Sequence, residues 1–345
     1  MAAVTIKDVA REAGVSVASV SRALNRGEGV TAETGERIRA VAKRLSYVPH
    51  AAARSLITRR THTIGALLPD LHGEFFSELI RGIDLAARAR GLHLLVSSSH
   101  DGLEDAAAAL QAMQGRVDGL LIMTPRIDAD FLQANVPASL PTVLLNSAVQ
   151  DDRYSVLNID NVAGAHAMVA HLIQAGYRRV AQIAGPLHNF DAQQRDLGYR
   201  RAMAKFAPGM ALDVVAGDFT EDSGYRAGRA LLARESRPEA IFAANDMMAV
   251  GCLYALREAG LEVPGDIAVA GFDDIPIARY VTPALSTVRV RIVELGRTAL
   301  EQLAAQLDGP ERPPASNQTL GCEIVIRDTC GANLELGLRK KNIKR

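Results

Sequence analysis

The sequence predicts a small all-α head with a helix-turn-helix, followed by an α/β body of two doubly wound parallel-sheet subdomains. Three observations predict this fold class. Apolar residues recur at helical spacing within the first 45 residues. From Thr63 onward, short continuous apolar segments alternate with helical segments, which is typical of parallel sheets covered on both faces. At 345 residues, the chain is also too long for one small core.

The head begins with two short amphipathic helices joined by one glycine. Thr5 and Asp8, three residues apart, are a capping signature for the start of the first helix. Gly14 provides the left-handed backbone that ends it, and Ser16 can cap the second helix. The residues predicted to face the core are Ile6, Val9, Ala10 and Ala13 from the first helix and Val20 and Leu24 from the second.

A third helix is expected over residues 33–45, with Ile38, Val41, Ala42 and Leu45 turned inward. Pro49 ends this region, because proline disfavours helix at the residue before it. Residues 51–56 are helix-prone but too few to form a stable helix alone in water. We therefore expect the head at residues 1–48, a hinge segment at 49–62 and the body at 63–345.

The exposed face of the second helix has the composition of a helix that enters a DNA major groove. Its exposed residues are Ala18, Ser21, Arg22 and Asn25, which are small or polar and include one arginine. Val17 lies at the first turn of the helix. Arg22 can donate two hydrogen bonds to guanine, whereas Val17 and Ala18 offer only van der Waals contacts, for example to a thymine methyl group. Hydroxyl and amide side chains placed to hold phosphates are Thr5, Ser16, Ser19, Ser21 and Asn25. For the serines, a helix cap or a plain surface position is the alternative.

Charge is distributed unevenly along the chain, although the formal net charge is zero. Residues 1–62 contain eleven Lys and Arg against five Asp and Glu, so the head and hinge together carry +6 and the remainder −6. A basic head on an acidic body favours nucleic-acid contact through the head. The charge alone could equally reflect a solvated basic face of a small helical domain. Such a face does not explain the charge and the two-helix pattern together.

The body contains two sets of alternating strands and helices. Expected strands lie at 64–68, 92–96, 119–123, 142–145 and 156–159, and then at 180–184, 214–217, 240–243 and 267–270. Expected helices cover 75–90, 104–114 and a segment from Asn161 to Gly176, with others between the later strands. In such sheets, ligands bind beyond the carboxyl ends of the strands.

The head, the body and several short motifs together resemble the lac repressor/galactose repressor family of bacterial transcription regulators over nearly the whole chain. The motifs are Gly82 after Phe75-Phe76, Asn158-Ile159-Asp160-Asn161 before Ala170-His171-Leu172, Ala243-Ala244-Asn245-Asp246, Val263-Pro264-Gly265-Asp266 and Gly271-Phe272-Asp273-Asp274. The resemblance implies a body of periplasmic-binding-protein type. Its first subdomain is expected at about 63–160 and 290–320, and its second at about 161–289 and 321–345.

The resemblance also implies how the chain binds DNA. The hinge becomes helical on the operator, where Ala53 and Leu56 contact DNA and the leucine wedges into the minor groove. The family binds palindromic double-stranded operators as homodimers, so that two heads meet two half-sites. We expect no tetramer through the tail, which lacks a long leucine heptad.

For the effector, the resemblance implies a cleft lined by Phe75, Phe76, Asn146, Arg195, Phe219, Asn245 and Asp273. Aromatic faces, a guanidinium, amides and a carboxylate suit a polyhydroxylated ligand, most simply a sugar. Alternatively, Asn245 only caps a helix, Asp273 only forms a turn, and Phe219 only packs in the core.

Three features depart from sugar-binding members of the family and leave the effector's identity open. His72-Gly73-Glu74 replaces an Asn-rich turn ending in Pro, Val290 and Ile292 replace a Gln and an aromatic residue, and the chain has no Trp.

Other functions fit the sequence less well. A periplasmic solute-binding protein would need a signal peptide, which the N-terminal sequence does not resemble, so we expect a cytoplasmic regulator without a membrane partner. We expect no enzyme and no cofactor, because adjacent residues such as those of Ser97–Asp101 cannot converge as a triad and no Gly-rich phosphate loop follows a strand. Cys252, Cys322 and Cys330 lack metal or redox spacing.

Overall fold

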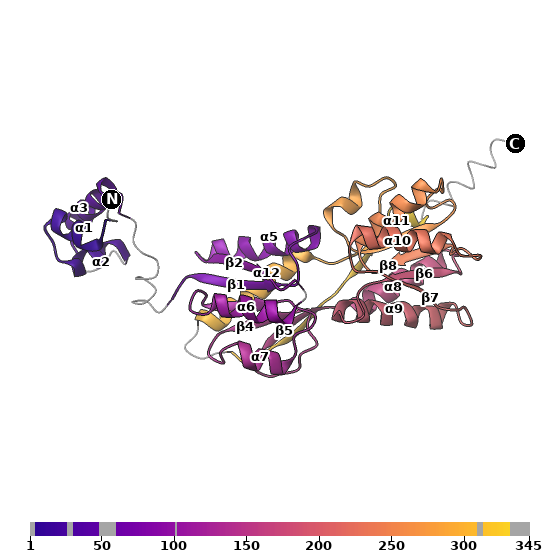
Figure 1. The fold of residues 1–345 in the computed structure, drawn as a ribbon, viewed down its shortest axis with the longest axis horizontal. Coiled ribbons are helices and arrows are strands. Elements are labelled where there is room, and N and C mark those ends of the chain that lie inside the picture. The colour runs from indigo at the N-terminus through magenta and orange to yellow at the C-terminus, as the bar shows by residue number, and fades with distance from the viewer. Residues whose placement is uncertain (1–3, 26–29, 48–59, 101, 309–312, 332–345) are drawn as a thin grey trace. The chain divides into compact units, whose positions relative to one another are not determined.

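The computed structural model describes residues 4–25, 30–47, 60–100, 102–308 and 313–331 (Figure 1). The hinge positions Ala53 and Leu56 lie outside these residues, as does the Asn25 side chain. The fold class predicted from the sequence is confirmed: a three-helix head precedes a body with two α/β subdomains.

The head contains α1 (Ile6–Ala13), α2 (Val17–Asn25) and α3 (Ala32–Arg44) around a core that includes Val9, Val20 and Ile38, all fully buried. The local signals for α1 are confirmed. The backbone N–H of Thr5 donates to Asp8 at 3.0 Å, and Gly14 adopts the left-handed conformation that ends the helix.

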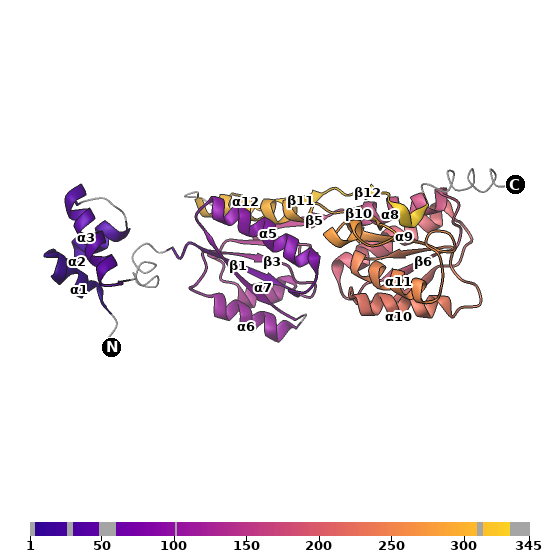
Figure 2. The ribbon, with the colours of Figure 1, turned by 90° about the horizontal axis from the view of Figure 1, so that it is seen from above.

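The first body subdomain is a six-stranded sheet in the order β11-β5-β4-β3-β1-β2, with α5 and α12 on one face and α6 and α7 on the other (Figures 1 and 2). Its strands are β1 (Thr63–Leu68), β2 (His93–Ser98), β3 (Gly119–Ile122), β4 (Thr142–Leu145), β5 (Ser155–Ile159) and β11 (Asn317–Leu320). Its helices are α5 (Glu74–Ala89), α6 (Leu103–Met113), α7 (Ala129–Asn135) and α12 (Ile292–Asp308). We call this unit subdomain 1.

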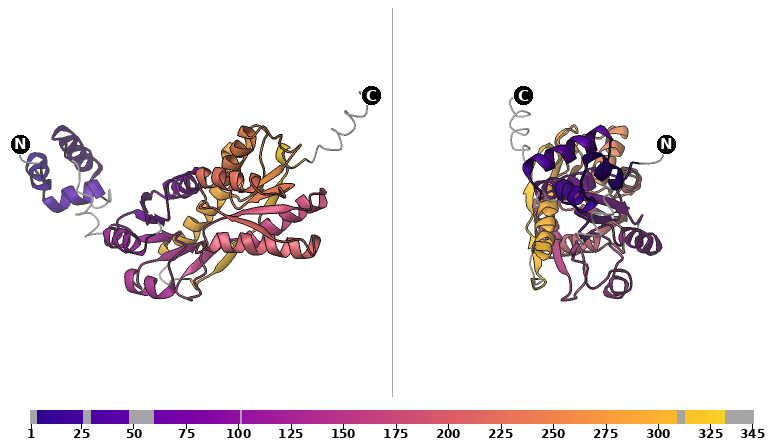
Figure 3. Two further views of the ribbon diagram at one scale, coloured as in Figure 1. Left: turned by 45° about the vertical axis from the view of Figure 1, so that its right-hand side comes forward. Right: turned by 90° about the vertical axis from the view of Figure 1, so that its left-hand side faces the viewer.

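The second body subdomain, subdomain 2, has the order β12-β10-β9-β8-β6-β7 between the helix pairs α8/α9 and α10/α11 (Figure 3). Its strands are β6 (Val180–Ala184), β7 (Asp213–Ala216), β8 (Ala240–Ala243), β9 (Ala268–Asp273), β10 (Ser286–Arg289) and β12 (Glu323–Val325). Its helices are α8 (Asn161–Gln174), α9 (Phe190–Phe206), α10 (Glu221–Leu232) and α11 (Asp246–Glu258), with the 3-10 turns η1 (Pro276–Arg279) and η2 (Asp328–Cys330). Among the described strands of this sheet, β12 runs antiparallel to β10, whereas the sequence predicted parallel strands alone.

The chain passes between the subdomains three times: at Asp160 between β5 and α8, at residues 290–291 between β10 and α12, and at residues 321–322 between β11 and β12. Figure 2 shows the β11–β12 segment running from one subdomain to the other. Three short connections of this kind allow one subdomain to rotate against the other as a unit.

Glycines allow α5 and α12 to pack closely in subdomain 1. A Cβ at Gly82 would lie 2.2 Å from the carbonyl oxygen of Val293, and one at Gly296 would lie 2.5 Å from that of Leu79. Gly82, which follows Phe75-Phe76 in one of the family motifs, therefore has a packing role, because glycine has no Cβ and the backbone of α12 can approach it closely.

Candidate ligand pocket and helix-turn-helix surface

A pocket of about 100 Å³ lies where the carboxyl ends of β1, β3, β8 and β9 meet the first turns of α5 and α9. It is therefore formed between the two subdomains, as expected for ligands of doubly wound sheets. Its lining residues are Pro69, His72, Gly73, Phe75, Phe76, Met123, Asn189, Asp191, Arg195, Phe219, Asn245, Met247, Asp273 and Ile275.

Arg195, on α9, is the central cation of this pocket and is only 3% exposed. Its Nε donates to Asn161 Oδ1 at 2.8 Å, and its Nη1 donates to the carbonyl oxygen of Ala244 at 2.6 Å. Its Nη2 lies 3.0 Å from Asp273 Oδ1, and its guanidinium lies 3.9 Å from the centre of the Phe272 ring. These contacts fix the orientation of the guanidinium plane.

Two buried carboxylates share this one guanidinium. Asp191 accepts from Asn146 Nδ2 at 2.9 Å and from Asn161 Nδ2 at 2.7 Å. Burial raises the pKa of Asp191, although Arg195 opposes the shift. Burial raises the pKa of Asp273 to about 6, where the charge of Arg195 opposes the shift and that of Asp191 adds to it.

Some acceptors in and behind the pocket lack a hydrogen bond among the described residues. The Oδ1 atom of Asn146 has none, and Asp273 Oδ1 lies near Arg195 without the alignment of a hydrogen bond. Buried acceptors without donors are costly, so a ligand hydroxyl that reaches them gains more than it would in water.

Several of these residues also have backbone conformations that are rare for side chains larger than glycine. The φ angles are +48° at Asn146, +71° at Phe219 and +113° at Asp273. Such strain gathers at binding sites when the surrounding structure holds it in place.

The structure brings six of the seven effector residues predicted from the sequence into this one pocket: Phe75, Phe76, Arg195, Phe219, Asn245 and Asp273. The seventh, Asn146, lies behind the lining and reaches the pocket through its hydrogen bond to Asp191. Asn245 also caps α11, with its Oδ1 accepting from the N–H of Met248, while its Nδ2 donates to the carbonyl oxygen of Phe219. Asn245 therefore both caps α11 and lines the pocket.

Sequence reasoning missed Asp191 and Asn161. Asp191 is four residues before Arg195 on one helix, a spacing at which an acid and an arginine lie on the same face, and this signal could have found it. Asn161 begins α8 within a motif that was read only as a family match, and its side chain links Arg195 to Asp191.

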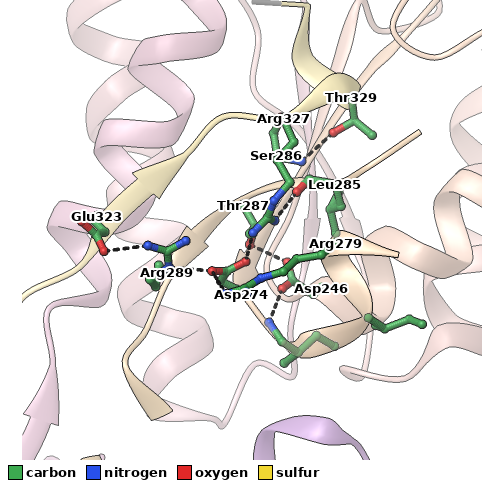
Figure 4. Close-up of polar contacts among 12 residues, drawn as sticks. Asp246, Asp274, Arg279, Leu285, Ser286, Thr287, Arg289, Glu323, Arg327 and Thr329 are labelled. Carbon is green, nitrogen blue, oxygen red and sulfur yellow. Dashed lines mark hydrogen bonds and ion pairs between the residues drawn. The ribbon is translucent and has the colours of Figure 1, made fainter. Parts of the chain in front are cut away.

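The segment after Asp273 joins the pocket to the connections between subdomains (Figure 4). Asp274, with φ of +55°, pairs with Arg289 at 2.6 Å and with Arg327. Arg289, at the end of β10, also pairs with Glu323 at the start of β12 at 3.1 Å. These ion pairs thus link the end of β9 to two of the three segments that cross between subdomains, residues 290–291 and residues 321–322.

The same segment contacts subdomain 1 directly. The N–H of Ile277, in the first turn of η1, donates to Glu74 Oε2 at 2.7 Å. No side chain next to η1 in sequence caps this turn, so Glu74 supplies the cap from across the cleft. The N–H of Ile275 donates to the buried Asp246 at 2.9 Å.

In the head, α2 presents the predicted surface residues to solvent. Val17 is 41% exposed, and Ala18 and Arg22 are exposed as well. The Arg22 Nε donates to the carbonyl oxygen of Ala18 at 3.3 Å, so its side chain lies along its own helix.

Ser16 caps α2, as its position suggested: its Oγ accepts from the N–H of Ser19 at 3.1 Å, and the two hydroxyls lie 2.9 Å apart. The Thr5 hydroxyl donates to Asp8. Ser21 is half-buried. The phosphate contacts assigned to these residues therefore stay a prediction.

Among the described residues, no helix is both long and apolar enough to cross a membrane. No group of three or more His, Cys, Asp or Glu side chains in the same part of the chain is arranged to hold a metal ion. Cys252, Cys322 and Cys330 all lie in the described part of the chain, and no disulfide joins them.

Both the head and the body of the chain are similar to known proteins. Residues 5–50 fit the model of bacterial regulatory proteins of the lacI family, and residues 169–330 fit the periplasmic binding protein-like domain. The ribose operon repressor of Escherichia coli (strain K12) is 37% identical over 311 residues, covering 89% of this chain and 94% of that protein.

Solved structures agree with this assignment. The lac repressor dimer bound to operator and the anti-inducer ONPF matches with a TM-score of 0.83 at 29% identity, covering 95% of this chain and 99% of that one. The complex of the transcriptional regulator CelR with cellobiose matches with a TM-score of 0.70 at 30% identity, covering 94% and 99%. The chain therefore belongs to the lacI family of bacterial transcriptional regulators, with a DNA-binding helix-turn-helix head and an effector-binding body of the periplasmic-binding-protein type.

Proposed function

We propose that this regulator is a repressor whose affinity for a palindromic operator is set by a neutral sugar bound next to Arg195. The observation that carries the proposal is the buried group of Arg195, Asp191 and Asp273, which is held by hydrogen bonds and an ion pair and contains one acceptor, Asp273 Oδ1, without an aligned hydrogen bond. Among relatives, a ribose operon repressor and a regulator bound to cellobiose support a sugar effector.

The chemistry of the pocket favours a neutral polyol. Two carboxylates face one guanidinium, so an added phosphate or carboxylate would meet net negative charge. Sugar hydroxyls both donate and accept, and they can satisfy Asp273 and Arg195 together. The rings of Phe75 and Phe76, 5.5 Å apart and nearly perpendicular, offer apolar faces to a sugar ring.

The proposed response couples cleft closure to the head. A sugar that contacts residues of both subdomains stabilises their closed arrangement, and the three connecting segments absorb the rotation. A difference of about 1.4 kcal/mol between the two arrangements changes operator affinity tenfold.

On the DNA side, Arg22 is proposed to read a base, with Val17 and Ala18 in apolar contact and Thr5, Ser16, Ser19, Ser21 and Asn25 holding phosphates. Ala53 and Leu56 are proposed as minor-groove contacts of the hinge at residues 49–62. The homodimer is expected to form through the body, residues 63–345. A DNA target places the protein in the cytoplasm, and the proposal assigns no catalytic residue.

The test measures operator binding by fluorescence anisotropy against a panel of sugars, in the native protein and in Arg195→Ala. The native protein should change operator affinity at least tenfold with one sugar, and Arg195→Ala should bind the operator without that response. Arg200→Ala is the matched control, because Arg200 lies on the same helix but pairs with Asp196 on its exposed side. A full sugar response in Arg195→Ala would show that the effector binds elsewhere.

A further inference from the structure

A cavity separate from the ligand pocket lies over the first turns of α8 and the second half of α9. Its volume is about 540 Å³, and it shares none of its described lining residues with the ligand pocket. We call it the basic cavity, because three of its lining side chains are basic. The lining residues are Asp160, Val162, Ala163, His166, Arg201 and Lys205.

Close packing of α8 against α9 places these basic side chains together (Figure 1). A Cβ at Gly198 would lie 2.5 Å from the carbonyl oxygen of Val162 and 3.0 Å from the backbone nitrogen of His166. Because glycine has no Cβ, the two helices approach closely at this point. Arg201 follows Gly198 by three residues and Lys205 follows Arg201 by four, so all three lie on one side of α9.

The two positive charges on α9 are not neutralised by acidic partners. Arg201 is exposed and makes no ion pair or hydrogen bond with any described residue. Lys205 has no ion pair within the described chain either, and its ammonium lies 5.0 Å from the centre of the Phe206 ring. Like charges four residues apart on a helix repel each other. An anion between Arg201 and Lys205 would therefore relieve a repulsion within α9.

The acids of the two helices are engaged elsewhere. Helix α8 contains no Asp or Glu. On α9, Asp191 belongs to the ligand pocket and Asp196 pairs with Arg200 at 2.6 Å. Asp160 is the one acid in the described lining, and its Oδ1 accepts from the N–H of Ala163 at 3.0 Å. This bond caps α8, so the attraction for an anion comes from the basic side chains and not from the helix end.

We propose that the basic cavity is a second, regulatory site that binds a small phosphate-bearing anion. Arg201 and Lys205 supply two positive charges, and a phosphate monoester carries close to two negative charges at neutral pH. Its three oxygens can accept from the guanidinium, the ammonium and the His166 ring, whereas a carboxylate has two oxygens and a single charge. The volume of about 540 Å³ also lies within the range of about 300–1,000 Å³ that is typical of small-molecule sites.

Asp160 links the basic cavity to the connections between the subdomains. It lies in the connection between β5 and α8, and its N–H donates to the carbonyl oxygen of Leu320 at 2.9 Å. Leu320 ends β11 directly before the connection at residues 321–322, so two of the three connections meet at one edge of the cavity. An anion held by α9 lies near the Asp160 carboxylate, and its affinity changes when Asp160 moves. The anion in turn favours one arrangement of the subdomains.

The binding test uses isothermal titration calorimetry on the full chain at constant ionic strength. The probes are inorganic phosphate and two matched pairs, namely glycerol 3-phosphate with glycerol and adenosine 5′-monophosphate with adenosine. Inorganic phosphate or at least one ester should bind ten or more times as tightly as the unphosphorylated compounds. Inorganic phosphate that binds as tightly as the esters identifies free phosphate as the ligand, whereas a tighter ester identifies a phosphorylated metabolite.

Variants then locate the anion. Arg201→Ala and Lys205→Ala should each weaken phosphate binding at least fivefold, and Arg201→Lys should retain more affinity than Arg201→Ala because it keeps the charge. Arg90→Ala, which removes an exposed arginine at the end of α5, is the matched control and should bind phosphate with native affinity. Equal phosphate affinity in Arg201→Ala and the native protein, or no phosphate binding at millimolar concentrations, would overturn the inference.

Operator affinity tests the regulatory role. Fluorescence anisotropy is measured with the tightest-binding phosphate probe in place of chloride at constant ionic strength, because salt alone weakens DNA binding. The native protein should change operator affinity at least threefold, and Arg201→Ala should show no such change. No change in the native protein, or an equal change in both proteins, would overturn the regulatory role. Since the basic cavity and the ligand pocket are separate, failure of every sugar to act would overturn the proposed function and leave this inference standing.

Discussion

Replacement of Asp273 by asparagine tests the electrostatics of the ligand pocket. Asp273 is 4% exposed, and the pKa of its carboxyl is raised from an ordinary value of 3.8 to about 6, chiefly by burial. A carboxyl with a raised pKa binds its proton more tightly in the folded chain than in the unfolded one. Its contribution to stability is therefore fully present below pH 3.8 and is lost as the pH rises through about 6.

The size of the effect follows from the two pKa values. The difference between 3.8 and about 6 corresponds to about 3 kcal/mol in total, at about 1.36 kcal/mol per pH unit. Roughly half of this, on the order of 1–2 kcal/mol, is lost between pH 5 and pH 8, because the other part is already lost between pH 3.8 and pH 5, where the unfolded-state carboxyl ionises and the folded-state carboxyl stays protonated. Asparagine does not titrate, so the free energy of unfolding of Asp273→Asn should gain on the order of 1–2 kcal/mol relative to the native protein when the pH is raised from 5 to 8.

The measurement is the thermal unfolding midpoint of the body at pH 5 and pH 8, for the native chain and for Asp273→Asn. The difference in Tm between variant and native protein should be roughly 3–6 °C more favourable to the variant at pH 8 than at pH 5. Asp84→Asn is the control, since it removes a carboxylate from the surface of α5, where Asp84 pairs with Arg88. An equal Tm difference at both pH values would refute this account of the pocket.

Four further predictions concern other parts of the chain. Arg22→Ala should reduce the ratio of operator to random-sequence affinity by about 1–3 kcal/mol, and an unchanged ratio in gel-shift titrations would exclude a base contact. Leu56→Ala should weaken operator binding but not non-specific binding, and equal loss of both would contradict a wedge. Gly82→Ala should lower the free energy of urea unfolding by about 1–3 kcal/mol, because the added Cβ meets Val293 O at 2.2 Å; stability at the native level would show that α12 moves away freely. Glu74→Ala, which removes the cap on Ile277, should weaken sugar binding about fivefold (about 1 kcal/mol), whereas calorimetry showing native affinity would mean that the contact does not favour the closed cleft.

Local sequence signals predicted most of the fold, because helices with caps and continuous apolar strands are determined by neighbouring residues. Thr142–Leu145, Val180–Ala184 and Ala240–Ala243 are strands with the predicted bounds. The short helix α7 was missed, since its seven residues span only two turns and show little periodicity.

The strands after β9 were also not predicted, because their pairing depends on contacts far away in the sequence. Strand β11 pairs with β5, so that Asn317 lies opposite Val156. The three-residue strand β12 pairs with β10 in the opposite direction. Exposed and polar, β11 resembles a loop in its sequence and is a strand only because β5 provides its partner.

The pocket was located by resemblance, but its chemistry required the structure. Arg195 and Asp273 are 78 positions apart in the sequence, yet their side chains are 3.0 Å apart. Asn146 was assigned to direct ligand contact, whereas in the structure it donates to Asp191, which itself lines the pocket. A residue that acts through another cannot be distinguished in sequence from one that touches the ligand.

The segment from Asp273 to Ile277 offers a physical route from the effector to the rest of the body. Asp273 lines the pocket, and its neighbour Asp274 holds Arg289 at the end of β10 and Arg327 beyond β12 (Figure 4). Ile277 is tied to α5 through Glu74. Asp273 and Asp274 both have positive φ angles, so a shift of one cannot be absorbed by small rotations without added strain. We propose that a sugar which moves the Asp273 carboxylate displaces contacts in the connecting segments and in subdomain 1 at once, which is the coupling that a ligand-controlled repressor needs.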